Sequence, residues 1–300
     1  MADDPHWPAL PLAAWEPTRA TVHMWTQIVG KIRLALTPYL NHWWQVPLYV
    51  GARGLSTSAI PHAGGSFEML FDFVGHELVI AKSDGVTLTL PLAPKSVAAF
   101  YAELMAALRE LGIAVEIWPM PVEIPNPIRF DRDEQHAHYD PDSASRFFRA
   151  LASADAVLKE FRGRFIGKAS PVHFFWGSFD LAVTRFSGRR APAIPNADAI
   201  TREAYSHEVS SVGWWPGDAT VPEPAFYTYA APQPAGFAEA PVRPAAAFFH
   251  KQLSQFLLRY EDARRAPSPR EAVLDFCQST YEAAAKLGKW NRAELERAAA

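Results

Sequence analysis

Residues 168–188, KASPVHFFWGSFDLAVTRFSG, form the segment of the chain with the clearest strand pattern. Aromatic and β-branched residues fill positions 172–176 and 179–186, which predicts two strands. Gly177 and Ser178 lie between them and are typical of a two-residue hairpin turn. We therefore predict an antiparallel hairpin in this segment.

Each face of the second predicted strand is apolar except for one charged side chain. Because side chains alternate along a strand, Arg185 lies on one face and Asp180 on the other. A charge on an apolar face must be paired, hydrated or used in function. One interpretation is an Asp–Arg ion pair or an exposed edge. The other is a polar cluster on the floor of an aromatic-walled pocket.

A second part of the chain resembles this one. The motif HWW at 42–44 resembles HFF at 173–175, and the segment VAAFY at 97–101 resembles AAAFF at 245–249. The matching segments come in the same order, which favours an internal duplication. If so, His42 and His173 occupy equivalent positions.

The predicted fold class is α+β, with two similar helix–antiparallel-sheet–helix halves and C-terminal helices. Prolines at 119–127 form a stiff connector and mark the boundary. The predicted divisions are an N-terminal arm at 1–16, a first half at 17–125 and a second half at 126–300, and the halves could pack as one unit. Helices are expected at 17–36, 94–111, 142–165, 244–260 and 269–287, and a further strand at 113–118.

Composition excludes several classes of function. The net charge of −3 argues against a general nucleic-acid or anionic-membrane partner, both of which require a basic face. The uncharged run at 34–52 contains two prolines and does not fit a transmembrane helix. Cys277 is the single cysteine, so no intrachain disulfide forms, and the N-terminus shows no leader pattern. A cytoplasmic location is expected.

The chain also lacks the common short catalytic and nucleotide-binding motifs. It contains no G-x-G-x-x-G, no phosphate-binding loop, no G-x-S-x-G and no H-E-x-x-H. Only His136, His138 and Asp140 resemble a metal-ligand pattern, and this spacing has low specificity. The alternative is a polar loop in which Asp140 or Asp142 caps the next helix. No metal and no cofactor are expected.

Five side chains are candidate acid–base residues, and all lie in or near aromatic motifs: His42, His173, His207, Glu208 and Asp180. A histidine with a suitable partner can act as a general base. His207 and Glu208 are adjacent on a predicted strand at 204–212, so they point in opposite directions and do not form a pair with each other.

The candidate ligand-binding residues are tryptophans that would form a wall and polar side chains that would hold an anion by charge-assisted bonds. The ligand-binding candidates are Trp25, Gln27, Lys31, Arg33, Trp43, Trp44, Lys168, Trp176, Arg185 and Trp215. Residues 213–218 predict an aromatic loop, either a lid over the site or a turn with its tryptophans packed inside.

Four motifs are similar to a bacterial family catalogued as domain of unknown function 5996. They are HMWTQ at 23–27, NHWWQVP at 41–47, SPVHFFWGSFD at 170–180 and AYSHE at 204–208, and the resemblance covers almost the whole chain. It implies a single-chain cytoplasmic protein of this length. It implies no activity, cofactor or catalytic residue.

Two classes of function therefore remain from the sequence. The first is a small-molecule-binding protein or metal-independent enzyme, catalysing hydrolysis or proton transfer on an anionic ligand. The second is an adaptor or chaperone-like module that presents an exposed aromatic patch to a partner peptide. Convergence of the polar residues at one place favours the first, whereas tryptophans exposed on a flat face favour the second.

Overall fold

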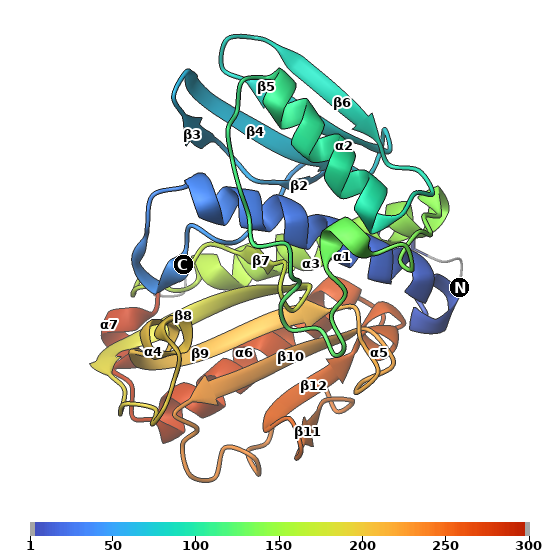
Figure 1. The fold of residues 1–300 in the computed structure, drawn as a ribbon. Helices are drawn as coiled ribbons and strands as arrows, with labels where there is room; N and C mark the ends of the chain where they lie inside the picture. Colours follow the sequence, from blue (N-terminus) through green and yellow to red (C-terminus); the bar gives the residue numbers. More distant parts are fainter. Residues whose placement is uncertain (1–3, 298–300) are drawn as a thin grey trace.

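The computed structural model describes residues 4–297, so residues 1–3 of the predicted arm and residues 298–300 lie outside the described residues. The protein has an α+β fold with two antiparallel sheets (Figure 1). The first half contains α1 (Leu12–Leu36), η1 (Asn41–Trp43), β1 (Tyr49–Val50), β2 (Gly54–Ser56), β3 (Ile60–His62), β4 (Gly65–Asp72), β5 (Glu77–Lys82), β6 (Thr87–Pro91) and α2 (Val97–Glu110).

The first sheet is an antiparallel meander covered on one face by two helices. Its strand order is β1-β2-β4-β5-β6, and β3 pairs with β4 beyond the end of β2. Alternation along β4 buries Phe67, Met69 and Phe71 on the helix-facing side. Trp25 of α1 stacks on Phe100 of α2, with ring centroids 4.7 Å apart, and Phe100 in turn contacts Phe71.

The second half contains η2 (Phe130–Arg132), α3 (Pro141–Gly163), β7 (His173–Phe175), β8 (Asp180–Arg190), α4 (Ala199–Ala204), β9 (His207–Trp215), β10 (Ala225–Ala231), β11 (Phe248–His250), β12 (Gln255–Arg259), α5 (Tyr260–Arg264), α6 (Pro269–Leu287) and α7 (Arg292–Leu295). Its sheet has the order β11-β12-β10-β9-β8-β7. The helices α3 and α6 pack on one face of it.

The two halves share a plan. Each starts with a long helix (α1 or α3), continues into an antiparallel meander, and then places a second helix (α2 or α6) on the same face as the first. The strand orders match when β12 takes the place of β6, which leaves β11 as an added edge strand. This is the arrangement expected of two similar halves.

The halves meet edge to edge at β1 and β7. Leu48 and Phe174 exchange both backbone hydrogen bonds, each at 2.9 Å. The Trp176 indole donates a hydrogen bond to the Val46 carbonyl at 2.9 Å and packs against Gly30 of α1. In Figure 1, α1 and α3 lie between the two sheets, and one cluster of buried apolar residues runs through both halves.

Several local predictions were wrong. The segment 244–260, predicted as a helix, is instead the hairpin of β11 and β12 followed by the start of α5. Edge-to-face contacts of Phe237, Phe249 and Phe256 hold the aromatic side chains in place there. Residues 113–118 pair with no described strand. The hairpin turn comprises residues 176–179 rather than two residues, and Phe179 adopts a φ of 59°.

The proposed equivalence of His42 and His173 also fails in register. His42 lies in η1, whereas His173 lies within β7. The residues that face each other across the junction are Leu48 and Phe174. The resemblance between 97–101 and 245–249 is likewise misleading, because only the first of these segments starts a helix. Similarity between the halves lies in strand order and not in these motifs.

Within residues 4–297, no helix combines the length and apolar character needed to cross a membrane.

Candidate functional site

The face of the second sheet opposite its helices carries three of the predicted acid–base residues, His173, Asp180 and His207. Cross-strand partners share a face, and one row runs from His173 through Ala182 and Gly213 to Tyr227. Alternation along β8 adds Asp180 to this face. Here we call it the outer face.

A histidine–lysine pair lies at one end of the outer face. Lys168 Nζ lies 2.7 Å from His42 Nε2, although the residues are 126 positions apart in sequence. His42 Nδ1 lies 3.0 Å from the Glu203 carbonyl oxygen, which can only accept a hydrogen bond. Nδ1 therefore carries the proton, and Nε2 is the acceptor that faces the lysine.

Aromatic rings flank the lysine. Lys168 Nζ lies 5.0 Å from the centre of the Phe186 ring and 5.5 Å from that of Trp44. The chain at Lys168 runs beside β8, and its carbonyl accepts a hydrogen bond from Phe186 N–H at 3.0 Å. Within residues 4–297 Lys168 forms no ion pair with a carboxylate, and the residue is exposed. An exposed ammonium group on an aromatic wall is thus available to an anion.

A second histidine borders the pair. The His207 and His42 rings have centroids 5.9 Å apart. His207 Nδ1 lies 3.0 Å from Ser206 Oγ. We call His42, Lys168, His207, Trp44 and Phe186 the Lys168 cluster.

The three ionisable side chains of the Lys168 cluster all have lowered pKa values. Partial desolvation lowers the pKa of Lys168. Desolvation and the Lys168 charge lower the pKa of His42. Desolvation, Arg190 and Lys168 likewise lower the pKa of His207. All three groups hold their protons less firmly than in water, so an added negative charge would raise all three pKa values.

The backbone of the cluster adopts an uncommon conformation. His42 and Trp43 have φ values of 59° and 61°, in the left-handed region that costs non-glycine residues about 1–3 kcal/mol each. The short helix α4 holds this turn, because Glu203 Oε1 accepts a hydrogen bond from His42 N–H at 2.9 Å. Sequence reasoning missed α4 and Glu203. Asp198, whose side chain caps α4, was the available signal.

His173 lies beside the cluster but is fully buried. Its ring centroid is 5.9 Å from that of Trp44 and 5.6 Å from that of Tyr49. Neither ring nitrogen has a hydrogen-bond partner among the described residues. Burial, with the nearby charges of Arg33 and Arg162, lowers the pKa of His173 to about 3. His173 is therefore neutral near pH 7.

Asp180 is buried at the other end of the outer face. Tyr227 donates its hydroxyl hydrogen to Asp180 Oδ2. Burial raises the pKa of Asp180 to about 7, even though this hydrogen bond acts in the opposite direction. The Tyr229 and Tyr205 hydroxyls lie 3.0 Å apart, and Tyr205 leads into the strand that carries His207. The Tyr227 and Tyr229 rings stack with centroids 6.3 Å apart, so these two hydrogen-bonded pairs lie next to each other on the outer face.

The other three predicted anion-binding cations lie at separate places. Arg185 is buried with its guanidinium 3.4 Å from the centre of the Phe161 ring, and it donates to the Phe161 carbonyl. Arg33 donates to Thr57 O and to Ser58 Oγ. Lys31 lies 5.0 Å from the Trp118 ring centre. The Asp–Arg ion pair that was one interpretation of the sequence does not form between Asp180 and Arg185, which contact Tyr227 and the Phe161 carbonyl instead.

The remaining ligand-binding candidates act mainly in packing. Gln27 exchanges two 2.8 Å hydrogen bonds with the backbone of Val122 and so anchors the proline-rich connector to α1. Trp25 stacks between aromatic rings in the core, and Trp43 contacts Tyr39. Trp176 packs at the junction of the halves, and Trp215 packs beside Tyr227. Trp215 belongs to β9, so the predicted loop at 213–218 is partly strand.

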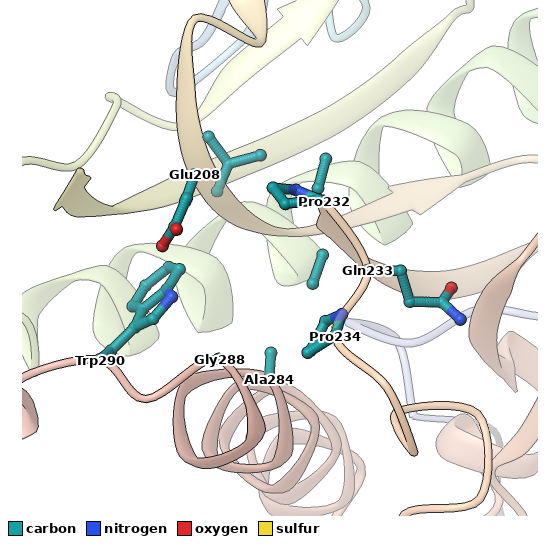
Figure 2. A pocket seen from close by; sticks show the side chains of 10 residues that line it. Glu208, Pro232, Gln233, Pro234, Ala284, Gly288 and Trp290 are labelled. Atoms are coloured by element: carbon teal, nitrogen blue, oxygen red, sulfur yellow. The ribbon is translucent and has the colours of Figure 1, made fainter. Parts of the chain in front are cut away.

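Glu208 points away from the cluster and borders a cavity of about 100 Å³. Figure 2 shows Glu208 near Trp290, with Pro232, Pro234 and Ala284 around the same space. Arg189 donates to Glu208 Oε2 at 2.6 and 3.0 Å, so this carboxylate is paired.

The three weak metal-ligand candidates are not grouped around a common point, and Asp140 has the capping role that the alternative interpretation gave it. His136 Nδ1 contacts Asp133 at 2.7 Å, whereas His138 is exposed. Asp140 caps α3 by accepting from Ser143 N–H at 3.0 Å. In the part of the chain that the structure describes, no three His, Cys, Asp or Glu residues form a group able to hold a metal ion.

No curated protein and no solved structure matches this chain. The model of one family, described as a family of unknown function (DUF5996), matches residues 7–297, which is nearly the whole chain. The motifs that carry the resemblance also supply His42, His173, Asp180 and His207 on the outer face. The chain belongs to the family of unknown function DUF5996.

Proposed function

We propose that the Lys168 cluster binds a small anionic molecule and that His42 transfers a proton there. The observation that carries this proposal is the 2.7 Å contact between Lys168 Nζ and His42 Nε2, made by a lysine without a carboxylate partner among the described residues. The Lys168 ammonium and two histidines that can be protonated suit an anion better than a cation.

The chemistry follows from the tautomer of His42. With Nδ1–H directed to the Glu203 carbonyl, Nε2 carries the lone pair that faces Lys168 and is the atom that can accept a proton and return it. Lys168 would hold the negative group of the ligand by a charge-assisted hydrogen bond. His207, 5.9 Å from His42 between ring centres, would add a second charge once protonated. This reaction class needs no metal or other cofactor.

The adaptor alternative has less support. The tryptophans named for it are buried or half-buried, with Trp25 and Trp176 buried. They do not form an exposed flat patch. A cytoplasmic location is part of our proposal, and the single cysteine, Cys277, is consistent with it.

The test is calorimetric titration with inorganic phosphate, acetate and succinate as probes. We expect Lys168→Met to weaken binding at least about tenfold, because a charge-assisted hydrogen bond contributes about 1.5–3 kcal/mol. The matched control is Lys286→Met, which removes an exposed lysine of α6. Equal binding by wild type and Lys168→Met, or equal loss in both variants, would contradict the proposal.

A second readout is proton linkage. Because the pKa values of His42, His207 and Lys168 are lowered in the free protein, an anion should raise them and draw in protons. We expect tighter binding at pH 6 than at pH 8, and heats that depend on the ionisation enthalpy of the buffer. In His42→Gln this proton uptake should decrease.

A further inference from the structure

A second cavity, of about 240 Å³, lies at the junction of the two halves. It is half open to solvent and is lined by Tyr49 and Val50 of β1, by α3, and by Pro171 and Val172 before β7. It shares no residue with the Lys168 cluster. At about 30 Å³ for each water molecule, its volume equals that of about eight waters, which suits a ligand the size of an amino acid.

One side of this cavity carries a buried carboxylate. The Asp155 side chain is 8% exposed, and its one ion pair within residues 4–297 is with Lys159 Nζ at 2.6 Å. The Lys159 side chain is 57% exposed and long enough to move into solvent. Burial raises the pKa of Asp155 despite this lysine. The carboxylate would therefore be stabilised by a cation that reaches it from inside the cavity.

The same helix supplies a cation to the cavity. Arg162 Nε donates a hydrogen bond to the Ser170 carbonyl at 2.6 Å, which fixes the guanidinium group. Its two terminal nitrogens have no hydrogen-bond partner among the described residues. Within the described residues Arg162 forms no ion pair. Asp155 and Arg162 are seven positions apart, or two turns of α3, so both lie on one side of the helix.

We propose that this cavity binds a small zwitterion, a molecule that carries both an ammonium group and a carboxylate. The ammonium group pairs with Asp155 in place of Lys159, and the carboxylate bonds to the terminal nitrogens of Arg162. The half-buried Tyr49 and the buried Val172 cover the carbon chain between them. A simple anion would bond to Arg162 and leave Asp155 with Lys159 as its partner. A simple cation would pair with Asp155 and leave the terminal nitrogens of Arg162 unused, so each singly charged ligand engages only one of the two groups.

The length of the helix segment favours a ligand with separated charges. Seven residues of α-helix rise about 10.5 Å, and the long Arg162 side chain can shorten that span. 4-Aminobutyrate is therefore the first probe, with glycine as the shorter and 6-aminohexanoate as the longer member of the series.

The test compares 4-aminobutyrate with butyrate and butylamine, each titrated into the full-length protein and followed by calorimetry. We expect 4-aminobutyrate to bind at least tenfold more tightly than either singly charged analogue. Asp155→Asn and Arg162→Gln should each weaken its binding at least tenfold, while Lys286→Met should not change it.

Lys159→Met is the variant whose expected effect, tighter binding, cannot result from misfolding. This variant removes the cation that competes for Asp155, so we expect 4-aminobutyrate to bind more tightly than to wild type. Butyrate binding as tightly as 4-aminobutyrate would identify a plain anion site and overturn the proposal. Loss of zwitterion binding in Lys159→Met, or no binding by any of the three zwitterions, would overturn it as well. The phosphate titration of the Lys168 cluster is independent of all these outcomes.

Discussion

At the scale of single residues, the fold buries ionisable side chains with little charge compensation. Asp180 has only the Tyr227 hydroxyl as a side-chain partner within the described residues. Among residues 4–297, His173 has no hydrogen-bond partner for either ring nitrogen, and Arg185 is surrounded by Phe161, Phe165 and Tyr281 instead of a carboxylate. Each such group shifts toward its neutral form or is stabilised by rings, because charge is costly away from water.

The raised pKa of Asp180 predicts a pH-dependent stability. A carboxyl group whose pKa is higher in the folded state contributes its full stabilisation below the unfolded pKa of about 3.9. That contribution is lost as the pH rises through about 7. The free energy of unfolding should fall over this window by up to about 1.4 kcal/mol per pH unit from this group.

Asp180→Asn should remove this dependence, because the amide is neutral and can still accept the Tyr227 hydrogen bond. Urea unfolding of wild type and variant at pH 5 and pH 8 checks the prediction. We expect the stability of Asp180→Asn relative to wild type to be greater at pH 8. An identical difference at the two pH values would show that Asp180 does not titrate in this range.

At the scale of elements, the contact between α1 and the β7–β8 turn requires a glycine. A Cβ added to Gly30 would overlap the Trp176 indole, which is held in place by its hydrogen bond to the Val46 carbonyl. The same tryptophan begins the turn between β7 and β8. The position of α1 therefore depends on a residue 146 positions later in the chain.

Gly30→Ala should destabilise the protein by up to about 2 kcal/mol. Alanine favours a helix by about 1 kcal/mol, but overpacking against a fixed indole costs about 1–3 kcal/mol or more. Gly163→Ala is the control, since Gly163 is also helical and a Cβ there meets no atom within 4 Å. Its midpoint in urea should equal or exceed that of wild type, whereas a stabilised Gly30→Ala would mean that Trp176 moves freely.

At the scale of the whole molecule, the two halves form one folding unit in our interpretation. The buried apolar cluster includes residues of both sheets and of α1, α2, α3 and α6. The paired hydrogen bonds of Leu48 and Phe174 complete the edges of β1 and β7, which would otherwise be exposed.

We therefore expect a single cooperative unfolding transition. Urea titrations followed by tryptophan fluorescence and by far-ultraviolet circular dichroism should coincide. Tryptophans lie in both halves, as Trp25 and Trp214 show, so a half that unfolded independently would appear as a separate step. Two resolved transitions would instead support independent domains with a boundary near residue 125.

Some helices and strands could be predicted from the sequence and others could not, for physical reasons. The helices near 17–36, 94–111, 142–165 and 269–287 have apolar periodicity and end signals, and all four are present. The helix predicted at 244–260 was wrong because the aromatic residues there suit a sheet only when Phe237 and the rest of the sheet lie beside them. For the proposed site, the sequence included His42, Lys168 and His207 among its candidates but could not separate them from Lys31, Arg33 and Arg185.

The sequence by itself determined the α+β class and the faces of β8, because strand alternation is local and places Asp180 and Arg185 on opposite sides whatever lies around them.

Only the tertiary structure decided which charges meet. Lys168 reaches His42 because one runs beside β8 and the other lies in a turn held by α4. Asp155 and Arg162 line a cavity because β1 packs against α3. Such long-range contacts depend on how the two sheets join at Leu48 and Phe174, and no local sequence pattern specifies that arrangement.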